Sequence, residues 1–204
     1  MATLQDKVQG YIGTFADTGS LTSWLQQSVR RLVDALPVDR LEFYSENLDD
    51  PDGTNGIAVT GHRILRAHKA GYGAHIVDPS IRPRLADAGS IYKATNTSPK
   101  AYIENGKGYV LPTGGTFIAF PYPSINYTTT AGGTAFLQDF EDFIVLPVAI
   151  KATEQDIASA EAQMKTYTET EEDFELAQAT SMRLKDLTLL LDRLRLEYDN
   201  LMKK

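Results

Sequence analysis

The sequence predicts an α+β protein: a mainly helical bundle that carries an inserted, small antiparallel β subdomain. Apolar residues recur at helical spacing towards both ends of the chain, while the middle alternates β-branched and aromatic runs with Gly, Pro and Asn. We expect an N-terminal helical hairpin at residues 1–48, a β-rich insertion at 57–128 and long C-terminal helices at 136–204. Residues 1–48 and 136–204 are expected to pack as one helical domain.

The first 48 residues predict two amphipathic helices separated by a break at residues 17–20. One face of the first helix is apolar and consists of Leu4, Val8, Tyr11, Ile12 and Phe15. The apolar stripe of the second consists of Trp24, Leu25, Val29, Leu32, Val33 and Leu36. Ser20 or Thr22 is its expected N-cap. Residues 46–56 are rich in Asp, Asn and Gly and are expected to form a loop.

The middle of the chain predicts short strands. They are expected at residues 57–60, 62–66, 72–77, 101–104, 109–111 and 116–120. Asn105-Gly106 lies between two of these runs, and this dipeptide is a strong signal for a β-hairpin. The sequence therefore predicts a hairpin at residues 101–111.

The C-terminal third predicts long helices. Pro147 is expected to kink or interrupt the first of them, and a softer break is expected at residues 166–172. The last helix has apolar residues at the a and d positions of three heptads: Leu184, Leu187, Leu191, Leu194, Tyr198 and Leu201. This seam is a candidate oligomer or partner interface. It can lie on its own domain, pair with the preceding helix at 153–167, or pair with a neighbouring subunit.

The composition excludes several classes of function. The 204-residue chain has no cysteine, which excludes disulfide scaffolds, cysteine-ligated zinc and thiol catalysis. A net charge of −7 argues against a protein that coats nucleic acid. No apolar run approaches the ~20 residues of a membrane span, and the first residues do not resemble a signal peptide. We expect a soluble protein, without membrane contact, made in the cytoplasm.

Basic residues cluster in the β-rich region. The candidate basic patch consists of Arg63, Arg66, Lys69, Arg82 and Arg84. It can face DNA or an acidic partner, or it can be a solvated or inter-subunit charged surface. Three histidines, His62, His68 and His75, lie in the same region, but their spacing is not that of a zinc motif.

No pattern in the chain predicts an enzyme. Gly114-Gly115 lacks the spacing of a phosphate-binding loop, and the adjacent carboxylates of Glu141 and Asp142 point in different directions on a helix. No serine lies in a nucleophile-elbow motif. We therefore predict no catalytic, cofactor-binding or metal-binding residues.

An ordered set of motifs lies between Gly73 and Ala152. It comprises PSIRPRL at residues 79–85, DAGSIYKAT at 87–95, YVLP at 109–112, and the acidic and aromatic segment that runs from Phe136 to Ala152. In this order the motifs resemble the head–tail connector (adaptor or neck) proteins of tailed bacteriophages. The resemblance covers somewhat under half of the chain, and two features depart from it: Pro147 and the long extension from Glu154 to Lys204.

The resemblance implies a structural virion protein at the neck, made in the host cytoplasm. Such a protein forms a cyclic homo-oligomeric ring that docks on the portal and joins the capsid to the tail. Its expected partners are the portal protein and the next neck or tail protein, with non-specific contact to packaged DNA in the channel. Two alternatives stay open: another tail or neck component, such as a tail-completion or fibre-attachment protein, and a non-viral coiled-coil adaptor or binding module.

Overall fold

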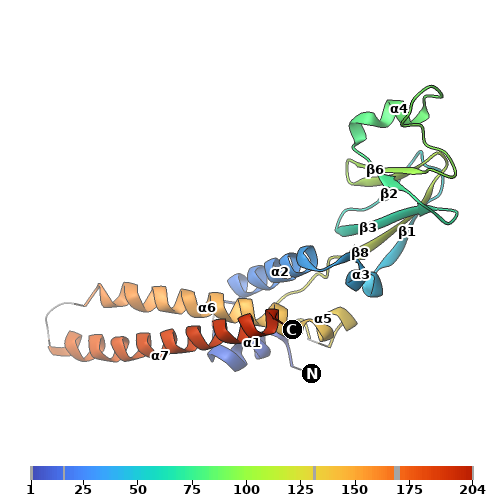
Figure 1. The fold of residues 1–204 in the computed structure, drawn as a ribbon. Coiled ribbons are helices and arrows are strands. Elements are labelled where there is room, and N and C mark those ends of the chain that lie inside the picture. Colours follow the sequence, from blue (N-terminus) through green and yellow to red (C-terminus); the bar gives the residue numbers. More distant parts are fainter. Residues whose placement is uncertain (1, 16, 131, 168–170, 204) are drawn as a thin grey trace. The chain divides into compact units, whose positions relative to one another are not determined.

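The computed structural model describes residues 2–15, 17–130, 132–167 and 171–203 (Figure 1). The chain is an α+β protein with two compact units: a helical unit made of residues 1–32 and 124–204, and a β unit made of residues 33–123. The helical unit is thus assembled from both ends of the sequence. The β unit begins at Val33, so the expected boundary at residue 48 falls inside it.

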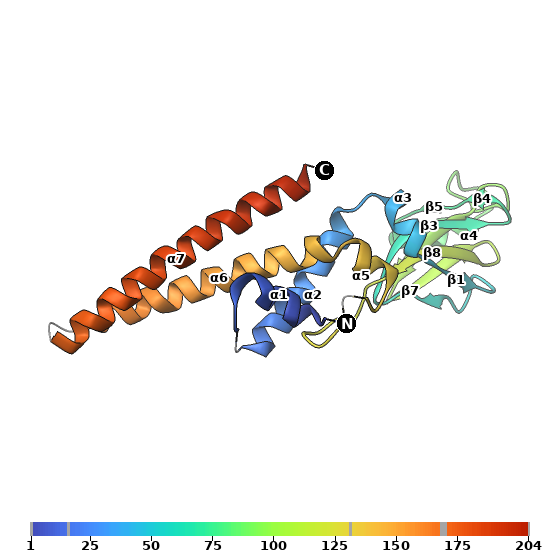
Figure 2. The ribbon, with the colours of Figure 1, turned by 90° about the horizontal axis from the view of Figure 1, so that it is seen from below.

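The helical unit is built around a long antiparallel pair of helices, α6 and α7, which lie side by side in both views (Figures 1 and 2). Its helices are α1 (Leu4–Ile12), most of α2 (Thr18–Ala35), α5 (Ala135–Asp139), α6 (Glu141–Met164) and α7 (Glu171–Met202). The α1 helix packs on α6, and Lys7 forms an ion pair of 2.8 Å with Glu141. Residues 168–170, in the expected break, lie outside the described residues.

The helix starts differ in part from the expectation. The α2 helix begins at Thr18, and the Asp17 carboxylate accepts a hydrogen bond of 3.0 Å from the Ser20 backbone N–H. The expected capping by Ser20 or Thr22 was therefore wrong. Thr3 caps α1 in a capping box with Asp6, in which each side chain accepts from the other residue's backbone N–H.

The α6 helix continues through Pro147 without interruption. Proline has no N–H and normally disrupts a helix interior. Here the Ser28 hydroxyl of α2 donates to the Ile144 carbonyl oxygen at 3.0 Å. The same hydroxyl lies 3.5 Å from the Phe143 carbonyl oxygen, which has no helical donor because Pro147 lacks an N–H. The buried face of α6 around this point packs into the core of the unit.

The β unit contains two four-stranded sheets. The first has the order β1 (Glu46–Asp50), β8 (Gly115–Pro121), β3 (His62–Lys69), β4 (Tyr72–Gly73), and the second the order β2 (Ile57–Ala58), β7 (Lys107–Leu111), β6 (Lys100–Glu104), β5 (His75–Ile76). All pairs are antiparallel except the short pair of β5 with β6, which is parallel, so the β subdomain is antiparallel as predicted apart from this pair. Short helical turns complete the unit: α3 (Val38–Leu41), η1 (Glu42–Tyr44), η2 (Pro79–Ile81) and α4 (Arg82–Ala86).

The core of the β unit lies between the two sheets. Ala67 and Phe117 of the first sheet pack with Ala101 and Val110 of the second. Because side chains alternate across a strand, Arg66 and Tyr102 lie on the two opposite outer faces. The predicted hairpin is confirmed: β6 and β7 are joined by Asn105 and Gly106, which have φ angles of 51° and 74°.

Residues 46–50 form the edge strand β1, so the prediction of a loop was wrong there. The segment is polar because an edge strand needs few inward side chains, and Leu48 supplies a partly buried contact to the core. The Asp50 carboxylate is buried and accepts hydrogen bonds from the backbone N–H groups of Gly53 (3.1 Å) and Val110 (2.8 Å). This side chain therefore ties the turn after β1 to β7.

Candidate interaction surfaces

The heptad seam of α7 is turned towards its own chain. Leu191 and Leu194 are buried, and the other four seam residues are half-buried against the α6 side: Leu184, Leu187, Tyr198 and Leu201. Of the arrangements that the sequence left open, the structure has the pairing with the preceding helix. Contact of this seam with another subunit stays a prediction, and only the half-buried positions are open to it.

Polar contacts fasten α7 to α6 outside the seam. Arg195 forms an ion pair of 2.8 Å with Glu154. Tyr167, just after α6, lies 3.2 Å from the hydroxyl of Thr180, which is itself buried. These contacts and the seam connect the two helices within one chain.

A shallow groove of about 350 Å³ lies between the first turns of α6 and the last turns of α7. It is lined by Asp142, Leu146, Arg193, Leu196, Glu197, Asn200 and Leu201. Burial raises the pKa of the nearby Tyr11 phenol, and the carboxylates of Glu197 and Asp142 raise that pKa further. Because three leucines and both signs of charge line the groove, it suits an apolar side chain from another protein better than a charged small molecule.

Sequence reasoning missed an exposed apolar row on the other side of α7. Met182, Leu189 and Leu196 are 58%, 69% and 62% exposed. They lie seven residues apart, and they occupy the f position when the seam residues occupy a and d. The sequence could have indicated this row, since f is the most solvent-exposed position of a paired helix and is normally polar, whereas here three successive f positions are apolar.

The predicted basic patch does not form one surface. Arg66 and Arg82 lie on the two opposite outer faces of the β unit, because they project from β3 of the first sheet and from α4 beside the second. Each of the two is also paired within the chain. The grouping of all five cations in one patch was therefore wrong.

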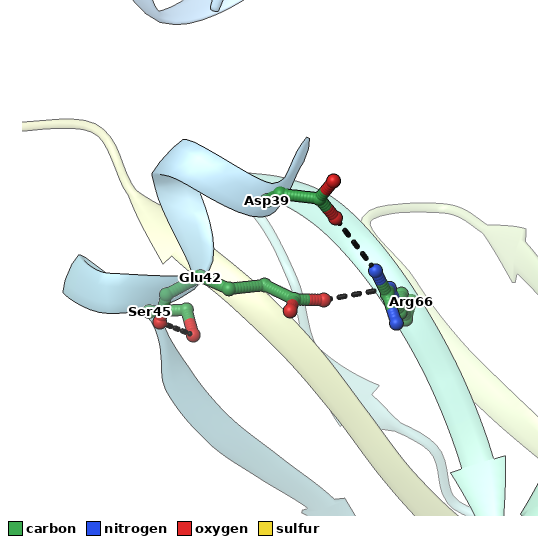
Figure 3. Close-up of polar contacts among 4 residues, drawn as sticks. All are labelled: Asp39, Glu42, Ser45 and Arg66. Carbon is green, nitrogen blue, oxygen red and sulfur yellow. Dashed lines mark hydrogen bonds and ion pairs between the residues drawn. The ribbon is translucent and has the colours of Figure 1, made fainter. Parts of the chain in front are cut away.

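Arg66 joins β3 to the helical turns that precede β1 (Figure 3). Its guanidinium lies 2.9 Å from the Asp39 carboxylate and 2.6 Å from that of Glu42. The Ser45 hydroxyl donates to the Glu42 carbonyl oxygen at 2.8 Å and closes the turn. Arg66 is thus neutralised by two acids of its own chain.

Arg63 caps the C-terminal end of α2. Its guanidinium donates to the carbonyl oxygens of Val33 and Leu36, the latter at 3.0 Å. These carbonyls lie at the C-terminal end of α2, where backbone oxygens have no helical partner and where a positive charge is favourable. Lys69, at the other end of β3, donates to the Thr113 hydroxyl.

Arg82 packs on an aromatic pair. The rings of Tyr102 and Tyr109 are stacked with centroids 4.9 Å apart, and the Arg82 guanidinium lies 5.8 Å and 6.0 Å from these centroids. Arg82 also pairs with Glu104 at 2.8 Å. Burial raises the pKa of Tyr102, and the charge of Arg82 partly opposes that rise. Arg84 is exposed on the same short helix.

No protein-family model matches the chain, and no curated protein matches its sequence. In the part of the chain that the structure describes, no three His or acidic side chains gather as metal ligands do. None of the described helices combines the length and the apolarity that a membrane crossing requires.

Proposed function

We propose that this chain is a structural virion protein, a head–tail connector that forms a ring on the portal and joins the capsid to the tail. In this proposal its partners are further copies of itself, the portal protein and the next neck or tail protein. In this proposal the chain acts through non-covalent contacts with other protein chains.

The observation that carries the proposal is that each unit presents large apolar side chains to solvent. In the β unit, Ile91 is 92% and Phe43 is 86% exposed; in the helical unit, Leu189 is 69% exposed. Exposed apolar surface is stabilised when another molecule covers it. A connector needs contact surfaces in more than one place, since it meets neighbouring copies and a protein on each side.

The positions of the motifs also support the proposal. Residues 79–95 form η2, α4 and the loop that carries Ile91, while Tyr109–Pro112 ends β7. The segment from Phe136 to Ala152 forms α5 and the first half of α6. The motifs therefore take up separate segments of the fold, one of them a loop, in the order in which the sequence carries them.

A second candidate is a non-viral coiled-coil adaptor or binding module. The observation that favours it is the antiparallel α6–α7 pair, whose heptad seam is satisfied within the chain. Such helix pairs serve as rigid arms in many unrelated proteins. A third candidate is another neck or tail component, such as a tail-completion or fibre-attachment protein. It would also be a structural virion protein and would differ only in its place in the particle.

Quantitative mass spectrometry of purified particles from the source tests the proposal. A copy number per particle similar to that of the portal protein is the expected result. Absence from the particle would overturn the proposal and favour the adaptor. A copy number unrelated to the portal would favour a different neck or tail component.

Interface variants then test the role of the exposed side chains. Ile91→Asp should leave the fold intact and reduce incorporation into particles, because it places a charge where the proposed interface is apolar. Ala88→Asp, an exposed position in the same loop, is the matched control and should be incorporated normally. Equal incorporation of both variants would remove Ile91 from the interface.

A further inference from the structure

The exposed row on α7 has the features of a helix–helix contact. We call Met182, Leu189 and Leu196 the outer row. They take successive f positions, opposite to the seam that packs on α6. Residues spaced seven apart stay nearly in line along a helix, and the row spans about 21 Å at 1.5 Å per residue. The outer row is therefore a narrow apolar strip that stays more than half exposed in the part of the chain that the structure describes.

Charged residues flank the outer row on both sides. Lys185 and Asp192 lie along one side, at the b positions, and Asp186 and Arg193 lie along the other, at the c positions. Each side thus carries one cation and one anion at the same spacing. Among the described residues, none of these four side chains takes part in an ion pair.

We propose that the outer row binds a second copy of this chain, with the two α7 helices antiparallel about a two-fold axis at Leu189. The axis places the two Leu189 side chains against each other and Met182 against the partner's Leu196. In an antiparallel pair, like heptad positions lie on the same side of the contact. Lys185 then faces the partner's Asp192, and Asp186 faces the partner's Arg193. The axis repeats both contacts, which gives four pairs of opposite charge.

The groove at the end of the outer row supports the same arrangement. Leu196 is one of its walls, and Leu146 and Leu201 are others. The two-fold axis brings the partner's Met182 to this height. Methionine is unbranched and flexible, so its side chain can fill an irregular apolar groove. The antiparallel direction also sets the two helix dipoles against each other favourably.

This contact differs from that of a ring. A two-fold contact uses the same surface on both copies and joins two chains, whereas a cyclic ring needs a contact between two different surfaces. The inference therefore goes beyond the proposed function and stands without it. The antiparallel dimer is a state of the free protein, or a contact between two assemblies.

Sedimentation velocity of the purified full chain, from about 1 to 100 µM, tests the dimer. The wild-type chain should shift from monomer to dimer in this range. Leu189→Glu should raise the dimer dissociation constant at least about 100-fold, since it removes apolar contact and places two like charges at the axis. Ala162→Glu, at an exposed position of α6, is the matched control and should dimerise like wild type. A wild-type chain that stays monomeric, or a Leu189→Glu dimer of normal strength, would overturn the proposal.

A charge swap tests the direction of the helices. Lys185→Glu alone should raise the dissociation constant about tenfold, because two attractive contacts become repulsive. The double variant Lys185→Glu/Asp192→Lys should restore the wild-type value, since antiparallel helices bring these two positions together. In a parallel pair b faces c instead, so the double variant would meet only like charges and dissociate further. That result would overturn the antiparallel arrangement. Circular dichroism of each variant verifies that the helices are intact.

Discussion

The Ser28 hydroxyl of α2 donates to the Ile144 carbonyl oxygen of α6 at 3.0 Å, one turn before Pro147. The side chain of Ser28 is buried, and the bond lies where a proline removes a backbone donor from the helix. Through this contact α2 supports the part of α6 that the sequence marked as a weak point.

Replacing Ser28 should therefore destabilise the protein. Ser28→Ala should lower the free energy of unfolding by about 1–2 kcal/mol, because the hydroxyl that donates to Ile144 and lies 3.5 Å from the Phe143 carbonyl oxygen is lost, and Pro147 gives the Phe143 oxygen no helical donor. Urea denaturation followed by circular dichroism gives the value. Ser23→Ala, an exposed serine on the same helix, should change it by less than about 0.5 kcal/mol. Equal effects of the two variants would contradict the role given to Ser28.

Asp50 should be the most sensitive carboxylate of the β unit. Asp50→Ala leaves the N–H groups of Gly53 and Val110 without their acceptor in a buried site. The expected loss is about 2–3 kcal/mol in the free energy of unfolding, as for hydrogen bonds to a charged group. Asp49→Ala removes an exposed contact to Thr116 and should cost under about 1 kcal/mol. Hydrogen exchange at Val110 should increase in the Asp50 variant alone.

Arg63 and Arg66 should differ in their contribution to stability, although they lie three residues apart on β3. Arg63→Ala leaves the carbonyl groups at the end of α2 without a donor and should cost about 1–3 kcal/mol. Arg66→Ala breaks exposed ion pairs, in which Arg66 and Asp39 are 55% and 86% exposed, and should cost at most about 1 kcal/mol. Thermal unfolding at low and high salt separates them: only the effect of Arg66→Ala should fade with salt.

Acid should weaken the start of α2. The pKa of the Asp17 carboxyl lies below its usual value of 3.8, because the hydroxyl and backbone N–H of Ser20 bond to the charged form. A pKa that is lower in the folded state gives stability that is present above the unfolded-state pKa and is lost as the pH falls through the folded one. Stability should therefore decline below about pH 4. Asp17→Ser keeps a capping oxygen without a titrating group, and should reduce the decline between pH 5 and pH 2 in a series of melting temperatures.

Leu194 should matter to the single chain, whatever the oligomeric state. It is 1% exposed between α7 and the rest of the helical unit. Leu194→Ala should lower the free energy of unfolding by about 2–5 kcal/mol through loss of contacts and a cavity. Leu187→Ala, at a half-buried position of the same seam, should cost less. If neither variant changed the free energy of unfolding of the monomer, the seam would not pack within the single chain and would instead be free to contact another chain.

Elements whose signals are local could be predicted from the sequence. The Asn105-Gly106 dipeptide specified its hairpin because two adjacent residues with positive φ match the twist of the strands. The a and d leucines specified a paired helix because their spacing alone puts them on one face. In both cases the information lies within a few turns or residues of the element that it describes.

Features that depend on residues far apart in the sequence could not be predicted in this way, because they follow from packing. The polar segment of β1 is a strand because β8, more than sixty residues later, pairs with it. The partner of the heptad seam is α6, a choice that spacing cannot make because it depends on which apolar face is nearest. The predicted basic patch separated because alternation along the strands and the packing of two sheets sent Arg66 and Arg82 to opposite faces. Charge patterns in a sequence show which side chains are available, and only packing shows which of them meet.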